Sequence, residues 1–129
     1  MLEMKKLPAV ILVLVLCAPL VADESLFTMR FANGRWWDTQ PEVAREAYVK
    51  GYLDSVQPFT PIKKLIDQCH CVTADTTAGV NGFYRLDQSY ARLPVTFAIR
   101  EYLERVTGTS VQTIRKESSD FSAALSGVQ

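Results

Sequence analysis

The tripeptide Cys69-His70-Cys71 is the one cluster of side chains in this sequence that could bind a metal or act as a nucleophile. A structural zinc site usually has four ligands, and the chain holds no other histidine and only one other cysteine, Cys17. A Cys–His catalytic pair needs a third group to orient the base; Asp67 is close in sequence, but adjacent helical positions point in different directions. We therefore expect no metal site, no cofactor and no catalytic residue, and we interpret Cys69 and Cys71 as a local disulfide.

A second cluster, Arg35-Trp36-Trp37, carries residue types that dominate the energetics of protein interfaces. The three residues precede the first predicted helix, and the small core of such a chain need not hold all of them. We therefore predict Arg35, Trp36 and Trp37 as partner-binding residues. Two alternatives stay open: the tryptophans stack on a sugar, or they pack over the start of the helix that follows.

The carboxylates are scattered along the chain. A glycosidase would need two of them at one site, and the sequence spacing gives no sign that any two converge. The side chains considered are Asp54, Asp67, Asp75, Asp87, Glu101 and Glu104. The sequence also has no glycine-rich phosphate loop, nucleophile elbow or metalloprotease helix. These patterns predict a protein that is not an enzyme.

Residues 1–22 have the three parts of a secretory signal peptide. Lys5-Lys6 supplies the positive start, Leu7 to Ala18 is an uncharged apolar run, and Leu20-Val21-Ala22 ends in a small residue. The apolar run is shorter than the ~20 residues of a membrane-spanning helix. We therefore expect cleavage after Ala22 and a periplasmic or secreted protein, in a compartment where thiols tend to pair.

Two alternatives to cleavage after Ala22 stay open. A lipidated Cys17 would hold the mature protein on a membrane, although bacterial lipoprotein signals have a small residue where this chain has Leu16. The segment could also remain attached as an N-terminal anchor.

The chain is electrically balanced, with 14 lysines and arginines against 14 aspartates and glutamates. No block of like charge occurs along it. Nucleic acids and anionic membranes attract proteins through clustered positive charge. We therefore expect no nucleic-acid partner, and contact with a membrane only during export.

The sequence after residue 22 predicts an all-α domain of about four short helices over residues 23–108, followed by a poorly ordered tail over 109–129. Residues 23–37 are expected to form an extended or irregular lead-in, with Asn33-Gly34 as a turn signal and a short hairpin as the alternative. Thr39-Gln40-Pro41-Glu42 fits a capping box, and Thr60-Pro61 repeats the pattern of a cap followed by proline. Apolar residues at helical spacing predict helices over 40–56, 61–69, 77–86 and 94–107.

Two expectations concern the packing of these helices. Ala47 and Gly51 lie on the predicted apolar face of the first helix, where small side chains would let another helix approach closely. On the last helix, the pairs Arg100–Glu104 and Glu101–Arg105 have the i,i+4 spacing of ion pairs on a solvent face.

Four segments occur in an order that a known family shares. They are Gly51-Tyr52-Leu53-Asp54 on a helix, Cys71-Val72 in a linker, the aromatic-rich stretch from Val80 to Leu86, and a final helix from Pro94 to Val106. Over residues 43–106 the chain thereby resembles the Tai-type immunity proteins of bacterial type VI secretion, small exported proteins that protect a cell from cell-wall amidase toxins. The chain departs from that family in its cysteines, which in the family lie well apart and bridge separate helices. The resemblance implies a helical fold and a toxin partner, and it assigns no contact residue.

Together these features predict an exported bacterial protein that binds another protein, in its specific form a periplasmic inhibitor of a toxin or hydrolase that degrades the cell wall. Two alternatives remain. One is a small secreted enzyme or carbohydrate-binding module that uses Trp36 and Trp37, and the other is an envelope protein of unknown role.

Overall fold

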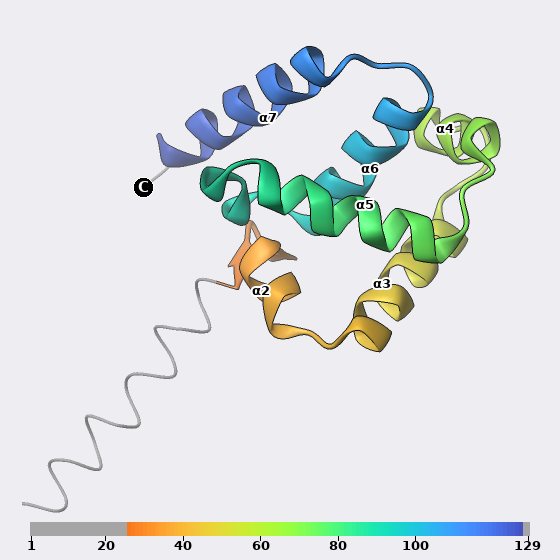
Figure 1. Ribbon diagram of the computed structural model, residues 1–129, viewed down its shortest axis with the longest axis horizontal. Coiled ribbons are helices and arrows are strands. Elements are labelled where there is room, and N and C mark those ends of the chain that lie inside the picture. The colour runs from red at the N-terminus through yellow and green to blue at the C-terminus, as the bar shows by residue number, and fades with distance from the viewer. Residues whose placement is uncertain (1–25, 128–129) are drawn as a thin grey trace, which may run out of the picture.

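The computed structural model describes residues 26–127, so the predicted leader and its cleavage site lie outside the described residues. Within this range the chain forms six α-helices, one 3₁₀ helix and a hairpin of two short strands, and the predicted all-α class is confirmed (Figure 1). In chain order the elements are β1 Phe27–Thr28, β2 Phe31–Ala32, α2 Gly34–Thr39, α3 Glu42–Ser55, α4 Pro61–Cys69, α5 Thr73–Leu86, η1 Gln88–Arg92, α6 Val95–Val106 and α7 Val111–Ser126. None of these helices is both long and apolar enough to cross a membrane.

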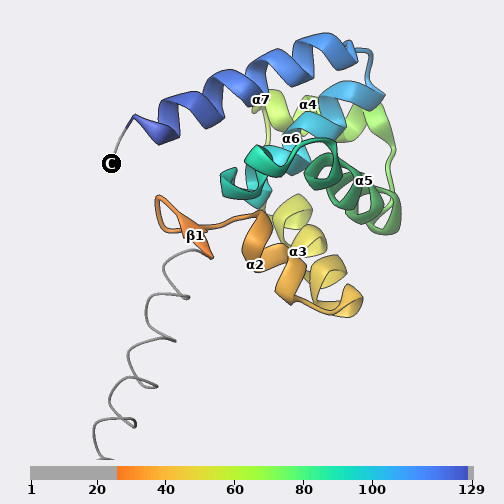
Figure 2. The same cartoon turned by 60° about the vertical axis from the view of Figure 1, so that its left-hand side comes forward.

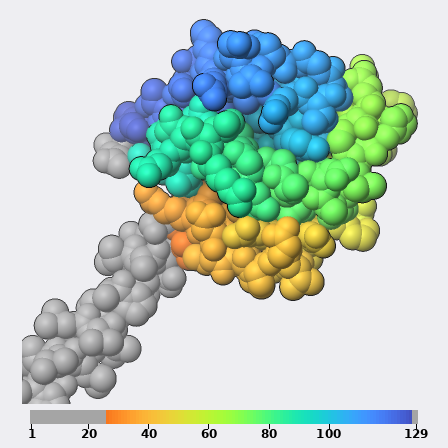
Figure 3. Space-filling view, viewed as in Figure 1, coloured from red at the N-terminus to blue at the C-terminus, as the bar shows by residue number. Residues whose placement is uncertain are grey.

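The α5 and α6 helices pack against each other at the centre of the domain (Figures 1 and 2). α3 lies against α5, α4 lies against α6, and α7 packs on η1 and α6. In the space-filling view, α2 and α3 form one edge of the domain and α7 the opposite edge, with α5 between them (Figure 3). The side chains that are closed to solvent include Trp37, Val49, Val80, Leu93, Val95, Ala98 and Ile99.

Helix starts follow the sequence signals only in part. Thr60 caps α4 as predicted, because its hydroxyl oxygen accepts a hydrogen bond from the backbone N–H of Lys63 at 3.3 Å, and Pro61 occupies the first turn. The capping box at Thr39 is wrong, since Thr39 is the last residue of α2 and α3 begins after Pro41 without a side-chain cap. The predicted lead-in instead contains α2, whose start Asn33 caps through its side-chain oxygen.

The predicted poorly ordered tail is wrong for most of its length, because Val111–Ser126 form α7. Ser110 caps this helix by accepting a hydrogen bond from the N–H of Thr113 at 3.2 Å. Ile114, Ser118 and Leu125 face the body of the domain and are buried. The sequence did not predict this helix because its few apolar residues lie among many serines and threonines. Ser118 can be buried because its hydroxyl donates to the carbonyl of Ile114 at 2.7 Å.

The close-contact face predicted for the first helix is also wrong. Ala47 and Gly51 are exposed, and a Cβ at Gly51 would meet no atom within 4 Å. The side of α3 that faces the core carries Val49, Tyr52 and Leu53. On this helix the aromatic and branched side chains, with their larger apolar area, decide which face is buried.

Cys69 and Cys71 are paired, with their Cα atoms 5.0 Å apart. Between them, His70 is exposed and has a φ of 52°, in the left-handed region that commonly ends helices. Its backbone N–H donates to the carbonyl of Ile66 at 3.3 Å, which closes the last turn of α4.

Candidate binding groove

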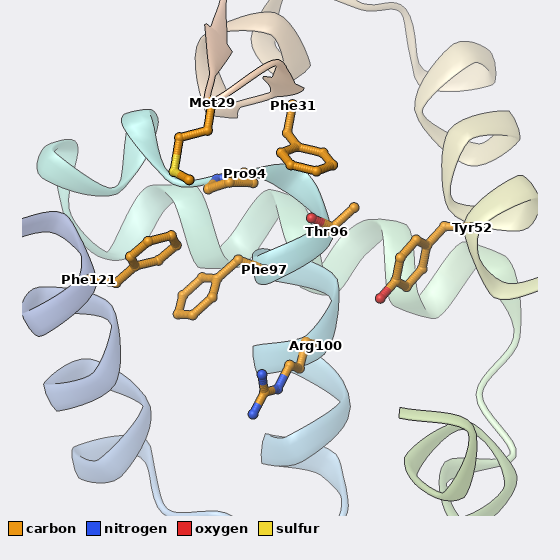
Figure 4. A pocket seen from close by; sticks show the side chains of 8 residues that line it. All are labelled: Met29, Phe31, Tyr52, Pro94, Thr96, Phe97, Arg100 and Phe121. Atoms are coloured by element: carbon orange, nitrogen blue, oxygen red, sulfur yellow. The ribbon is translucent and has the colours of Figure 1, made fainter. Parts of the chain in front are cut away.

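An open apolar groove of about 290 Å³ lies where the β1–β2 hairpin, α3, α6 and α7 meet (Figure 4). Its lining residues are Met29, Phe31, Tyr52, Pro94, Thr96, Phe97, Arg100 and Phe121. We call this feature the hairpin groove. Figure 4 shows Met29 and Phe31 reaching down from the hairpin, with Phe97 and Phe121 together on the opposite side.

Aromatic packing fixes the side of the groove that α6 and α7 provide. The rings of Phe97 and Phe121 have centroids 5.0 Å apart, and Phe97 also contacts Phe83 edge-on at 6.1 Å. Phe83 belongs to the buried core and stacks on Tyr90 at 5.1 Å. Because this chain of rings continues from the core into the groove, the position of Phe97 is set before any partner arrives.

The other side of the groove is a hairpin with a strained turn. Thr28 pairs with Phe31, so Met29 and Arg30 form a two-residue loop, and both have positive φ values of 52° and 72°. Such loops favour Asn-Gly, since residues with a Cβ pay about 1–2 kcal/mol in the left-handed region. The turn nevertheless exposes 69% of Met29 and 54% of Phe31.

Hydrogen bonds hold this hairpin to the domain. The Thr28 hydroxyl donates to the carbonyl of Arg92. The Asn33 side chain donates to the Thr28 hydroxyl oxygen at 3.1 Å, and the Asn33 N–H donates to the carbonyl of Leu26 at 3.1 Å. A single bridge between Asn33 and Pro94 connects the base of the hairpin to the start of α6. The surrounding structure therefore fixes the strained turn in place.

Arg100 supplies a positive charge at one end of the groove (Figure 4). Its side chain is 59% exposed and pairs with Glu104 through Nε at 3.1 Å. Nearby, burial raises the pKa of the Tyr52 hydroxyl, and the charge of Arg100 offsets part of that rise. The eight lining side chains offer no carboxylate, imidazole or thiol. This set of groups can hold an apolar side chain.

The predicted partner-binding residues lie elsewhere. Trp37 is completely buried, with its indole N–H donating to Asn81 at 2.7 Å and the Arg45 guanidinium 5.5 Å above its ring, so its assignment to a binding surface is wrong. Trp36 is half-buried and packs on Tyr48 of α3 at 5.2 Å. Only Arg35 is exposed.

Sequence reasoning missed the groove because its residues come from four separate segments. One local signal was available. Phe97 falls outside the apolar stripe that predicts the helix at 94–107, and a large aromatic ring beside such a stripe indicates a second contact surface.

No family model, curated protein or solved structure matches this chain significantly. The chemistry of the groove and the pattern of the N-terminal sequence therefore have to carry any functional assignment.

Proposed function

We propose that this chain is an exported, non-enzymatic protein-binding domain whose hairpin groove holds a segment of a partner protein. The observation that carries the proposal is the exposed hairpin tip, with its strained Met29-Arg30 turn and the neighbouring Phe31, facing the fixed aromatic pair of Phe97 and Phe121. In its specific form, the partner is a toxin or hydrolase that degrades the cell wall, and the domain acts as its periplasmic inhibitor.

The groove favours a protein segment over a small metabolite. Small-molecule sites are concave cavities of about 300–1,000 Å³ that enclose most of their ligand. The hairpin groove, at about 290 Å³, lies just below that range and is open to solvent, with Met29 and Phe31 largely exposed. It suits one or two large apolar side chains projecting from a protein surface.

Strain in the hairpin supports a binding role for its tip. Two adjacent residues with positive φ and a Cβ reduce stability, and the packing energy that Met29 and Phe31 give in return is limited because more than half of each side chain is exposed. Features of this kind concentrate where a chain contacts ligands or partners.

Two sequence features support the inhibitor form of the proposal. The pattern of residues 1–22 directs the domain to the compartment where cell-wall hydrolases act. The order of segments over residues 43–106 resembles that of the Tai-type immunity proteins. The groove residues Met29, Phe31 and Phe121 lie outside that range, whereas Tyr52, Phe97 and the other lining residues lie within it, so the resemblance covers only part of the proposed contact surface.

A photo-crosslinking experiment in the exporting cell tests the binding role. A photoreactive phenylalanine analogue replaces Phe31 in one variant and Phe59 in a control variant. Phe59 is 98% exposed and is not among the groove residues. We expect a discrete crosslinked protein from position 31 and none from position 59. The same product from both positions, or no product from either, contradicts the proposal.

The identified partner is then purified for affinity measurements. Phe31→Ala and Met29→Ala should each weaken its binding at least tenfold, equivalent to about 1.4 kcal/mol, while Phe59→Ala leaves the affinity unchanged. A partner with cell-wall hydrolase activity that the wild-type protein inhibits supports the specific form. Peptidoglycan cleavage by the purified protein itself would overturn the non-enzymatic assignment.

A further inference from the structure

Three carboxylates converge between α6 and α7. Glu101 and Glu104 lie one turn apart on α6 and so share a side of the helix, and Glu117 approaches from α7. Each contributes an oxygen atom, and these atoms all lie within 4.8 Å of one another. Without a compensating charge, three carboxylates at this spacing repel one another.

Glu101 makes this cluster different from an ordinary acidic surface. The residue is only 1% exposed, and the predicted ion pair with Arg105 on a solvent face is wrong for this reason. Its Oε2 atom is buried and has no hydrogen-bond partner in the part of the chain that the structure describes. Burying a carboxylate oxygen without a hydrogen-bond partner destabilises the folded state, and only a bound proton, cation or water molecule can offset this cost.

The positive charge near the three carboxylates does not balance their negative charge. Arg100 pairs with Glu104, as predicted, through Nε at 3.1 Å. Arg105 lies with Glu101 along a separate cavity of about 20 Å³, which has room for about one water molecule. One guanidinium in direct contact with the cluster therefore faces three carboxylates.

We propose that Glu101, Glu104 and Glu117 bind a hard divalent cation, Ca²⁺ in the first instance, that links α7 to α6. Carboxylate oxygens are the ligands that Ca²⁺ and Mg²⁺ prefer. Ca²⁺ tolerates the irregular geometry of side chains from two helices, whereas Mg²⁺ requires near-octahedral coordination and retains several waters. Together with the guanidinium of Arg100, a divalent charge balances the three carboxylates and gives the buried Glu101 carboxylate a partner.

The competing occupant is a proton shared between Glu101 and Glu117. Burial and the neighbouring carboxylates of Glu104 and Glu117 raise the pKa of Glu101 to about 8. A proton and a cation compete for the same oxygens, so a titration with metal separates the two explanations.

Calorimetric titration of the purified protein with CaCl₂, and in parallel MgCl₂, tests the site. We expect saturable binding of one Ca²⁺ and a rise in Tm that follows the Ca²⁺ concentration. Glu117→Gln and Glu101→Gln should each weaken this affinity by about tenfold or more, since affinity depends on the number of charged ligands. Asp120→Asn is the matched control, because it removes the same charge one turn further along α7, at a residue outside the group of three carboxylates, where Asp120 pairs with Lys116.

Paramagnetic Mn²⁺ gives a second readout that locates the ion. Under substoichiometric Mn²⁺, the amide signals around residues 101–104 and 117 should broaden first. Absence of saturable binding overturns the proposal, as does an equal loss in Asp120→Asn, or broadening centred elsewhere. Glu117 is exposed, so Glu117→Gln keeps the test decisive even if replacing the buried Glu101 prevents folding.

Discussion

The aromatic ring of Tyr102 occupies the position that a Cβ atom at Gly79 would take. Gly79 lies on α5 and Tyr102 on α6, the two helices that pack most extensively against each other. The missing side chain at Gly79 lets the ring lie directly on the α5 backbone. This glycine therefore sets how closely the two central helices approach.

Gly79→Ala should lower the free energy of unfolding by about 1–3 kcal/mol, the usual cost of forcing an extra carbon into a packed interface. Gly82→Ala is the control on the same helix, because a Cβ there meets no atom within 4 Å. It should stabilise the protein by about 0.5–1 kcal/mol through its higher helix propensity. Urea unfolding of both variants measures the two values. Equal effects would show that Tyr102 moves aside freely.

The contrast between Gly79 and Gly51 shows what the sequence could predict. Helical periodicity located α3, α4 and α6 closely, because spacing, prolines and the Thr60 cap are local signals. The close-contact glycine was placed on α3, since small residues recur there at helical spacing. Which glycine meets a neighbouring helix depends on the rotation of each helix about its axis, and only tertiary packing fixes that rotation.

The candidate sites were harder to predict than the helices. The hairpin groove joins Phe31, Phe97 and Phe121, and the acidic cluster joins Glu101 with Glu117. Both depend on α7, which the sequence predicted as a poorly ordered tail because serines and threonines dilute its apolar stripe. Once that helix was missing from the expected fold, neither convergence could be inferred from spacing alone.

The two adjacent tryptophans should respond differently to truncation. Trp37→Ala removes a completely buried ring and leaves Asn81 and Arg45 without contacts that they now make, so we expect a loss of about 3–5 kcal/mol or failure to fold. Trp36→Ala loses a half-buried ring that packs on Tyr48 and should cost less. Thermal unfolding followed by circular dichroism compares them. A larger loss at Trp36 would contradict the burial described for α2.

Phe59 combines a positive φ of 66° with an exposed fraction of 98%. Replacing Phe59 with glycine loses no packing and relieves a backbone strain of about 1–2 kcal/mol. The greater flexibility of glycine in the unfolded chain lowers the free energy of unfolding by about 0.4–1 kcal/mol. Phe59→Gly should therefore leave the free energy of unfolding unchanged or raise it by up to about 1.6 kcal/mol. Phe59→Ala, which keeps the Cβ, is the control and should gain nothing. A marked loss in Phe59→Gly would mean that the ring contacts the folded domain.

The burial of Glu101 predicts how stability depends on pH when a chelator keeps divalent cations away. Burial, and then the charges of Glu104 and Glu117, raise the pKa of this carboxyl from 4.5 to about 8, while Arg100 acts in the opposite direction. Between these values the folded protein holds a proton that the unfolded chain has released, so the free energy of unfolding falls as the pH rises from about 4.5 to about 8. The glutamine in Glu101→Gln does not titrate in this range, so the free energy of unfolding of the variant lacks this contribution to the pH dependence. Relative to wild type, the variant should therefore become more stable as the pH rises from about 4.5 to about 8. Urea unfolding at several pH values measures that difference, and Asp120→Asn serves as the exposed control. A difference that stays constant with pH would show that Glu101 keeps its ordinary pKa in the folded protein.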